Sequence, residues 1–336
     1  MRYRSCEGLE QNYMLFQGKL DRNRNYVTFC CRDGAENVSV ELCKNPEDTI
    51  KNYIARRDEI INASKSLSEA NEHYEICSRC SVFQEKDWVQ NDKFLVHQIV
   101  YGITPAPCQA KCIYCSQQVE KRRTYDIKQD SAQHELIFET LEYMKENDMF
   151  APNIRWDIGS GEIAVHPYRA RIYNLVANSD TSWLTNCFLF DENIARNLKV
   201  NTSSNLLFSI DSGTSETWHK IKGVDNFDHV KQNVHAYSNA AALKAQILLK
   251  YLILPGINDD FNELIAFVEF AIEINAMFVV ISRDRWAKNS DAIKAAGFLQ
   301  ALLGRNGIKS QYSFFSSEDQ REIRKVAQQV SAQVYG

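Results

Sequence analysis

Three cysteines stand within eight residues of one another, at Cys108, Cys112 and Cys115, in the stretch that covers residues 105–116. A short loop can turn all three thiols toward one point, whereas three side chains at this spacing cannot all face one hydrophobic core. Such a set of thiols suits an iron–sulfur cluster. Four iron atoms need four outer ligands, so three thiolates leave one iron open to a small molecule that chelates it. The spacing therefore predicts reactive chemistry at a metal cluster.

This C-x3-C-x2-C spacing, with Tyr114 directly before the last cysteine, resembles the signature of the radical S-adenosylmethionine (SAM) superfamily. In that family SAM chelates the open iron, and an electron from the cluster cleaves SAM to methionine and a 5′-deoxyadenosyl radical, which takes a hydrogen atom from the substrate. The resemblance implies a 4Fe-4S cluster on the three cysteines and SAM beside it, with Tyr114 in the binding site. It also implies an electron donor such as flavodoxin or ferredoxin.

A zinc site is the alternative for these thiols. Cys77 and Cys80 form one C-x2-C pair, and Cys112 and Cys115 form another. Two such pairs can bind one zinc ion. However, the segment between the pairs is longer than usual and includes an expected barrel strand, and Cys108 would be left over. The motifs downstream agree with the cluster, so the sequence favours iron–sulfur chemistry.

Length and charge narrow the class of protein. The 336 residues suffice for a barrel-sized domain and a smaller one. A formal charge of −4 at pH 7 provides no basic field that would attract nucleic acid or an anionic membrane. The sequence starts without an apolar leader and its apolar runs are too short to span a bilayer, so we expect a cytoplasmic protein. Ten cysteines in such a chain fit metal ligands better than disulfides.

Residues 1–94 are expected to form a small N-terminal, cysteine-rich, metal-binding domain. A strand is expected near residues 26–31, and a helix at residues 46–67, where apolar residues recur at helical spacing. Apolar residues are too few for a comfortable independent core, so a bound metal is a reasonable stabilising element. The cysteines of this region are Cys6, Cys30, Cys31, Cys43, Cys77 and Cys80.

The layout of these cysteines resembles the auxiliary-cluster regions of SPASM/Twitch-type radical SAM enzymes, although those usually follow the barrel and this region precedes it. The resemblance implies a second, auxiliary 4Fe-4S cluster. A structural zinc ion on the same ligands is the alternative. Cys43 is expected to be a buried small side chain. The implied ligands of the auxiliary cluster are Cys6, one of Cys30 and Cys31, Cys77 and Cys80.

From residue 95 to residue 303 the sequence alternates between apolar strands and helices. Strands are expected at residues 95–102, 154–158, 183–189, 206–210, 247–254 and 278–281. Helices are expected at about residues 129–147, 167–178, 191–199, 226–240, 260–275 and 288–303. This alternation predicts an α/β fold with a parallel sheet, here a partial (β/α)6 TIM-type barrel. Residues 304–336 would form a short C-terminal extension whose final helix docks on the barrel.

In such barrels the working residues lie at the carboxyl ends of strands. The second strand is followed by Gly159, Ser160, Gly161 and Glu162. This loop resembles the family's G-G-E motif, which holds the amino group of the methionine part of SAM. Taken without the resemblance, two glycines at this spacing also occur as an ordinary tight turn.

The fourth and fifth strands end in further motifs of this kind. Ser209 and Asp211 resemble the S-x-D segment that addresses the ribose and carboxylate of SAM, and alternation along the strand points both inward. Asp211, or one of the hydroxyl residues after it, could also cap the following helix, and both roles are compatible. Pro255, Gly256 and Ile257 resemble the turn beneath the adenine ring of SAM.

Two charged side chains lie near the ends of apolar strands. Lys250 stands within the fifth strand, and a buried ammonium group needs a partner. We expect Lys250 in the cavity, near a carboxylate of SAM or of the substrate. Arg283, at the end of the sixth strand, either meets an anionic group of the substrate or forms an ion pair with Asp284.

Cys187 occupies the place where the family's T-N-G strand end usually has glycine. A thiol at this place could face the substrate and donate a hydrogen atom to a carbon radical, after abstraction from the other side, which would invert a stereocentre. The alternative is that Cys187 packs as a small core residue.

The sequence therefore predicts a radical SAM enzyme that causes a redox change or an epimerisation of a polar metabolite, a carbohydrate or a peptide. Radical methyl transfer, or the formation of C–C or C–S bonds, is the alternative within enzymes. A non-catalytic zinc-binding scaffold or an electron carrier is the alternative from another class.

Overall fold

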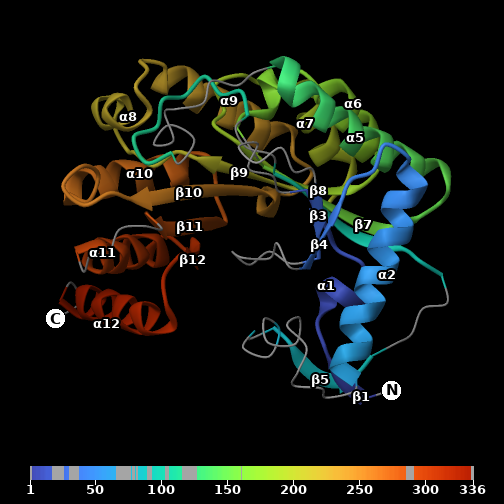
Figure 1. Cartoon of the computed structure of the whole chain (residues 1–336). Helices are drawn as coiled ribbons and strands as arrows, with labels where there is room; N and C mark the ends of the chain where they lie inside the picture. The colour runs from blue at the N-terminus through green and yellow to red at the C-terminus, as the bar shows by residue number, and fades with distance from the viewer. Residues whose placement is uncertain are drawn as a thin grey trace. The chain divides into compact units, whose positions relative to one another are not determined.

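The computed structural model describes residues 2–16, 26–29, 38–65, 77, 80, 82–88, 93–102, 106–115, 127–159, 161–284 and 291–333. The chain divides into two compact units. Unit 1 comprises Met1–Ala106, Arg123–Gly161 and Pro167–Thr181, and unit 2 comprises Pro107–Arg122, Glu162–His166 and Ser182–Gly336. Figure 1 gives the labels of their helices and strands.

The sheet of unit 1 is mixed, with strands in the order β7-β6-β2-β3-β4. Its strands are β2 (Met14–Phe16), β3 (Tyr26–Thr28), β4 (Ser39–Glu41), β6 (Val96–Tyr101) and β7 (Phe150–Ile158). β6 pairs in parallel with β2 and β7, whereas β3 pairs antiparallel with β2 and β4. A separate antiparallel pair consists of β1 (Arg2–Ser5) and β5 (Gln84–Asp87). The strand predicted near residues 26–31 is present as β3.

The helices of unit 1 are α1 (Glu7–Glu10), α2 (Pro46–Lys65), α5 (Ile127–Glu146) and α6 (Arg169–Val176). α2, the long blue helix of Figure 1, begins with a proline, which needs no hydrogen-bond acceptor in the first helical turn. Its acidic first turn faces the positive end of the helix dipole. On the buried side, the Tyr53 hydroxyl donates to the Tyr13 carbonyl over 2.6 Å. The helix predicted at residues 46–67 is thereby confirmed.

The sheet of unit 2 is parallel, with strands in the order β12-β11-β10-β9-β8. Its strands are β8 (Asp180–Thr185), β9 (Asn205–Ser209), β10 (Ile247–Ile253), β11 (Phe278–Arg283) and β12 (Lys309–Ser313). Its helices are α7 (Glu192–Val200), α8 (Ser215–Lys222), α9 (Phe227–Ala240), α10 (Phe261–Glu273), α11 (Asp291–Arg305) and α12 (Ser317–Gln333), with 3-10 turns at Ile163–Val165 and Lys244–Gln246.

Alternate side chains of these strands face the helices. Trp183 of β8 is buried and donates its indole N–H to Asn197 of α7 over 3.0 Å. Tyr251 of β10 packs on Phe267 of α10, with ring centroids 4.6 Å apart. Because side chains alternate along a strand, Lys250 must project from the opposite face of the sheet.

The predicted fold class is confirmed: the fold is α/β, with parallel strands and helices in alternation, and the described strands close no complete barrel. The strand expected at residues 183–189 instead ends at Thr185, because the chain turns at Cys187, whose φ is 62°. The C-terminal extension continues the alternation, since β12 pairs in parallel with β11 and α12 packs beside α11. The division at residues 94 and 303 remains a prediction.

Helix starts follow the polar residues of the sequence. Thr214 caps α8, because its hydroxyl accepts a hydrogen bond from the backbone N–H of Thr217. Asp191 and Asp260 cap α7 and α10 in the same way. The capping role that the sequence offered to Asp211 therefore falls to Thr214, which leaves the Asp211 carboxylate available for other contacts.

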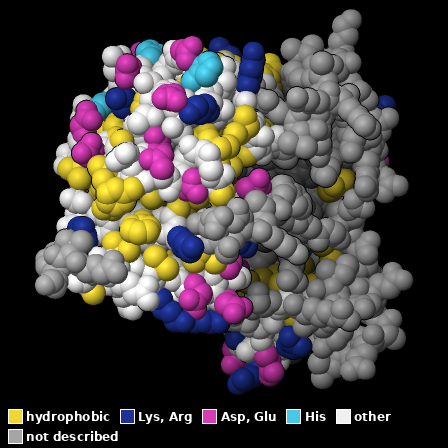
Figure 2. Space-filling view, turned by 90° about the vertical axis from the view of Figure 1, so that its left-hand side faces the viewer, with side chains coloured by type: hydrophobic (Ala, Val, Ile, Leu, Met, Phe, Trp, Pro, Cys, Tyr) yellow, Lys and Arg dark blue, Asp and Glu magenta, His cyan; other side chains and the backbone are white. Residues whose placement is uncertain are grey.

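The surface mixes side chains of several kinds. Figure 2 shows hydrophobic side chains interspersed with acidic and basic ones on the described part of one face. Phe261 and Phe298 are among the exposed large apolar residues of the described chain, and their rings meet edge to face with centroids 6.1 Å apart. Exposed apolar side chains of this kind are ordinary on a protein surface. Among the described helices, none is long and apolar enough to cross a membrane.

Candidate functional site

The cysteine loop, residues 107–115 of unit 2, is anchored on the C-terminal end of α8. The backbone N–H of Lys111 donates to the Lys222 carbonyl over 2.9 Å, and that of Ile113 donates to the Ile221 carbonyl over 3.0 Å. The last carbonyls of a helix have no partner inside the helix, so they are available to a neighbouring segment. The loop therefore satisfies the end of α8, and α8 in turn fixes the backbone around Cys112.

Gly223 makes this anchoring possible. It ends α8 with a φ of 70°, a left-handed conformation that glycine adopts without strain. A Cβ atom at this position would lie 3.1 Å from the Cβ atom of Lys111. Glycine therefore serves both the helix end and the close approach of the cysteine loop.

The three thiols differ in their surroundings. Cys108 is solvent-exposed, and Cys112 and Cys115 are half-buried, with the Cys115 N–H donating to the Cys112 carbonyl over 3.1 Å. Burial of the sulfur raises the pKa of the Cys108 thiol to about 11. Burial also raises the pKa of Cys112, while the nearby charge of Lys222 opposes that effect. A bound metal deprotonates such thiols, so this donor set fits a cluster.

A buried network connects the loop to the sheet. The Tyr114 hydroxyl donates to the Asp211 carboxylate over 2.5 Å, and the Lys222 ammonium contacts the same oxygen at 2.5 Å and the Tyr114 hydroxyl at 2.9 Å. The Asp211 and Lys222 side chains are 0% and 1% exposed. Burial raises the pKa of Tyr114 well above its usual value, which keeps the phenol protonated as a donor.

Hydrogen bonds also fix the backbone and the side chain of Asp211. Its φ is 59°, an uncommon conformation for a residue with a side chain. The other carboxylate oxygen accepts the Leu252 N–H over 2.8 Å, and the Asp211 carbonyl accepts from the Asn258 side chain over 2.8 Å. The Asp211 carboxylate thus has hydrogen-bond partners from β10, α8 and the cysteine loop. Protein donors therefore occupy the carboxylate that the sequence assigned to SAM.

Apolar contacts complete this arrangement. Ile221, Leu252 and Leu254 form a buried cluster, against which Tyr114 and Ile257 pack. The structure thereby brings together Tyr114, Asp211 and Ile257, which the sequence proposed separately as SAM contacts.

The turn after β10 belongs to the same region. Gly256 has a φ of 78°, and its N–H donates to the Asp259 carboxylate over 2.7 Å. The Ile257 N–H, which follows Pro255 and Gly256, closes the turn on the Leu254 carbonyl over 3.0 Å. These bonds make a tight, defined turn.

Glu162 joins the cysteine loop to the end of β8. Its N–H donates to the Pro107 carbonyl over 2.7 Å, and its carboxylate accepts from the Thr185 hydroxyl at 2.9 Å and the Asn186 N–H at 2.7 Å. The Asn186 amide then reaches the Cys108 sulfur at 3.5 Å. Burial raises the pKa of Glu162, against the lowering effect of these bonds. The carboxylate therefore orients protein groups beside the triad.

Both glycines of the same motif belong to unit 1. Gly159, in unit 1, donates its N–H to the Tyr101 carbonyl over 3.1 Å. Gly161 has a φ of 57° and so needs glycine. Ser160 lies outside the described residues. The proposed contact of these residues with SAM remains a prediction.

Cys187 is completely buried, with 0% of its surface exposed. Burial raises the pKa of its thiol well above the usual value. Its backbone adopts the left-handed conformation, with a φ of 62°, which explains why glycine suits this position. Its N–H donates to the Thr185 hydroxyl, and its carbonyl accepts from Asn233. These features favour the packing alternative, and the donor role remains a prediction.

Lys250 and Ser209 are paired in register on neighbouring parallel strands, and both are half-buried. Paired residues of parallel strands point to the same face, so these two side chains share the face away from the helices. No hydrogen bond or ion pair of the Lys250 ammonium occurs among the described residues.

Arg283 has a partner that neither alternative from the sequence included. Its guanidinium lies 3.2 Å from the Asp319 carboxylate of α12 and donates to the Phe314 carbonyl over 2.9 Å. The expected pair with Asp284 is therefore replaced by a contact that holds the start of α12 to the end of β11. The alternative contact of Arg283 with an anionic group of the substrate remains a prediction. The sequence did not reveal this partner, because only the packing of α12 brings Asp319 within reach of the Arg283 guanidinium.

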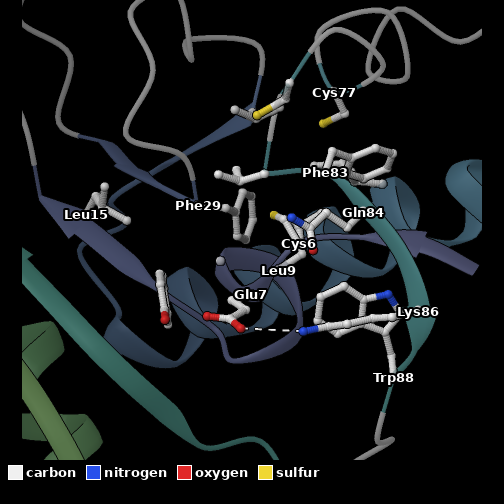
Figure 3. Close-up of a pocket in the computed structure, with 16 residues that line it drawn as sticks. Cys6, Glu7, Leu9, Leu15, Phe29, Cys77, Phe83, Gln84, Lys86 and Trp88 are labelled. Atoms are coloured by element: carbon white, nitrogen blue, oxygen red, sulfur yellow. Dashed lines mark hydrogen bonds and ion pairs between the residues drawn. The ribbon is translucent and has the colours of Figure 1, made fainter. Parts of the chain in front are cut away.

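Unit 1 contains a cavity of about 430 Å³ around which three of the proposed auxiliary ligands stand. Cys6, Cys77 and Cys80 line it together with apolar and aromatic side chains, including Phe29 and Phe83 (Figure 3). Figure 3 also shows the ion pair of Glu7 and Lys86, 3.5 Å apart, among the lining residues.

The fourth auxiliary ligand lies outside the described residues, since both Cys30 and Cys31 do. Phe29, the residue before Cys30, lines the cavity. Cys43 is half-buried, not buried as expected, and its sulfur accepts from the exposed Asn52 amide over 3.6 Å. Among the residues that the structure describes, no three side chains of His, Cys, Asp or Glu converge as one mononuclear metal ion would need.

Sequence reasoning missed Lys222, Asn258 and Asn186. Lys222 had a signal, since a lysine directly before the glycine that ends a helix lies close to whatever packs on that end. Asn258 follows the turn of Pro255 to Ile257, where a side-chain amide often bonds backbone groups. Asn186 directly precedes Cys187 in the sequence. Only the structure shows that its side-chain amide contacts the Cys108 sulfur.

Residues 105–268 match the family model described as the Radical SAM superfamily. No curated protein matches the sequence. Solved structures similar to this chain include Streptococcus suis SuiB bound to the precursor peptide SuiA (12% identity, TM-score 0.45, covering 100% of this chain and 71% of that chain). A further structure of Streptococcus suis SuiB has 10% identity and a TM-score of 0.49, and covers 96% of this chain and 73% of that one.

A radical SAM methyltransferase from Sphaerobacter thermophilus has 12% identity and a TM-score of 0.43, and covers 80% of this chain and 92% of that one. Residues 105–268, which contain the cysteine loop, Glu162, Asp211 and the turn after β10, are thereby identified as a radical SAM domain.

Proposed function

We propose that this radical SAM enzyme acts on a polar metabolite, a carbohydrate or a peptide, with a redox change or an epimerisation as the outcome. The observation that carries the proposal is the cysteine loop, whose three thiols stand on a backbone fixed by α8 and by Glu162. When bound, the cluster and SAM together supply a one-electron reductive cleavage of SAM and thereby a carbon-centred radical that takes hydrogen from the substrate. The electron comes from an external donor such as flavodoxin or ferredoxin.

In this proposal the protein contributes position and the exclusion of water. Cys108, Cys112 and Cys115 hold the cluster, and Tyr114 closes the loop against the apolar cluster of Ile221, Leu252 and Leu254. The remaining assignments to SAM are carried by the resemblance and by the positions of the residues at strand ends. They are Gly159, Ser160, Gly161, Glu162, Ser209, Asp211, Pro255, Gly256 and Ile257.

Two of these residues have modified roles in the proposal. Because the carboxylates of Glu162 and Asp211 are occupied by protein donors, we assign them the task of orienting neighbouring groups. Glu162 orients Asn186, and Asp211 orients Tyr114. Direct contact with SAM then falls to backbone groups and to Ser209.

Lys250 is proposed as the group that meets an anionic part of the substrate or of SAM. Its support is its place beside Ser209 on the face away from the helices. A half-buried ammonium group gains most from an anionic partner, because it is already partly desolvated. Lys250→Met separates the two partners. A raised KM for an anionic substrate with unchanged uncoupled cleavage of SAM indicates the substrate, and slower uncoupled cleavage indicates SAM.

The auxiliary cluster is proposed on Cys6, Cys77, Cys80 and one of Cys30 and Cys31. The shared cavity of the first three residues supports it. Its function would be to take an electron from the substrate radical or to pass one inward. Iron and sulfide analysis of the reconstituted protein tests it, because two clusters bring about eight irons per chain and one cluster brings about four.

Anaerobic reconstitution with iron and sulfide, followed by dithionite and SAM, tests the proposed function. Formation of 5′-deoxyadenosine supports the enzyme. A reconstituted protein that shows no brown colour, binds zinc instead and releases no 5′-deoxyadenosine would be a scaffold or an electron carrier. Cys108→Ala should abolish the product, while Cys43→Ala, the matched control, should retain it.

Mass spectrometry of candidate substrates in deuterated water then separates the outcomes. Solvent deuterium at carbon indicates epimerisation with an exchangeable donor such as a thiol. A gain of a methyl group, or a new C–C or C–S bond, indicates the alternative reactions.

A further inference from the structure

Lys222 and Asp211 form an ion pair whose two side chains are almost fully buried. Such a pair is a poor source of stability, because the cost of removing both charges from water offsets their attraction. Its members come from α8 and from the end of β9, and both contact Tyr114 of the cysteine loop. The pair is therefore better explained by what it holds in place.

Lys222 contacts the cysteine loop on both sides of Cys112. Its backbone carbonyl accepts the N–H of Lys111, directly before Cys112. Its ammonium contacts the hydroxyl of Tyr114, two residues after Cys112 and directly before Cys115. The neighbouring helix residue, Ile221, accepts the N–H between these two points. One turn of α8 thus determines the path of the loop through Cys112.

Two aromatic rings also hold the Lys222 ammonium beside the loop. Its nitrogen lies over the rings of Tyr114 and Trp218, 5.2 and 5.5 Å from their centroids. These cation–π contacts add to the bonds that fix Tyr114.

We propose that Lys222 is a positioning residue for the cluster, which holds Cys112 and Cys115 in place through its bonds to Tyr114, to Asp211 and to the loop backbone. The inference rests on the proposed function, because it assumes that the triad binds the cluster. Residues that orient metal ligands from outside the coordination sphere typically affect metal affinity by about 10- to 100-fold.

Three variants test this inference on the full-length chain. Tyr114→Phe removes one hydroxyl and leaves the ring packed on Ile221 and Leu252. Lys222→Met removes the charge from a buried chain of similar length. Lys220→Met is the matched control, because Lys220 lies on the same helix but is exposed and pairs with Glu216.

The readouts are the rate at which a chelator removes iron after anaerobic reconstitution, and the electron paramagnetic resonance spectrum of the dithionite-reduced protein with and without SAM. We expect Tyr114→Phe and Lys222→Met to lose the SAM-responsive signal about 10- to 100-fold faster than wild type. Lys220→Met should match wild type. Equal rates and spectra in all four proteins would overturn the inference.

A double variant separates positioning from folding. Lys222→Met with Asp211→Asn removes both buried charges, so its thermal midpoint should recover toward wild type. If the inference holds, its SAM-responsive cluster is still lost rapidly. If cluster retention recovers together with the midpoint, Lys222 acts only through stability and the inference is wrong. A wild-type protein that forms no SAM-responsive cluster would instead refute the proposed function.

Discussion

The two cysteine-rich regions differ in what holds their thiols. In unit 2 the residues beside Cys112 are bonded to the end of α8, and a buried network fixes Tyr114. In unit 1, Cys6, Cys77 and Cys80 surround an apolar cavity of about 430 Å³. A cluster site that leaves one iron open to a cofactor has only three protein ligands to define its geometry. Such a site benefits from a loop that the surrounding protein already fixes before the cluster binds. The auxiliary site proposed in unit 1 would have four protein ligands and would gain its geometry from the metal itself.

The largest effects are expected when one thiol is removed from each of the two cysteine-rich regions. Cys112→Ala should reduce the formation of 5′-deoxyadenosine to background, because the cluster that cleaves SAM loses a ligand. Cys77→Ala should remove about four irons per chain and retain that product. Iron analysis and chromatography of the products measure both results. Retained product in Cys112→Ala would contradict the assignment of the triad.

The second test uses pH, which should act on a helix of unit 1. His134 on α5 is buried against Tyr168, with ring centroids 4.8 Å apart. Burial lowers the pKa of His134 from 6.5 to about 4, and the charge of Arg171 contributes. The unfolded chain therefore binds a proton at this histidine more readily than the folded chain does. The contribution of the neutral His134 ring to the free energy of unfolding is fully present above pH 6.5 and is lost as pH falls toward 4.

The loss should amount to about 3 kcal/mol at most for this one group. Denaturant unfolding of wild type and His134→Gln at several pH values measures it, because the variant has no group that titrates there. A wild-type curve parallel to that of the variant between pH 4 and 6.5 would show that His134 is not buried as a neutral ring.

The third test sharpens the role of α8 in unit 2. Gly223→Ala should cost roughly 1–2 kcal/mol of stability through its positive φ, and it should also push Lys111 and the cysteine loop away. Gly256→Ala is the matched control, because its φ is 78° but no atom lies within 4 Å of the added Cβ. Both variants should lose stability in denaturant, and only Gly223→Ala should lose iron faster. Equal iron loss would mean that the contact with Lys111 is unimportant.

The smallest effect is expected at Cys187. Because its φ is 62°, Cys187→Gly removes local strain of about 1 kcal/mol but also a buried side chain, so the net change in stability should be small. Cys187→Ala keeps the strain and loses the sulfur. If both variants retain turnover with the same product, the thiol is a packing group. Loss of solvent deuterium from the product in both would support the donor role instead.

A large part of the fold could be predicted from the sequence. The strands and helices of residues 95–303 follow from apolar runs and turn residues, which are local properties. The helix caps Asp191 and Asp260 lie where a polar residue precedes a helical pattern. Errors occur where a long-range contact or an unusual backbone conformation decides, as at the end of β8.

The sequence by itself indicated the family: the spacing of Cys108, Cys112 and Cys115 and the motifs at strand ends resemble the radical SAM superfamily, whose model matches residues 105–268. Only the tertiary structure decided how that loop is held. Lys222 and Tyr114 are 108 residues apart in the chain, and nothing local to either residue reveals the other. A buried charge finds its partner through the packing of the whole unit. For this reason the carboxylates of Asp211 and Glu162 were recognisable in the sequence while their partners were not.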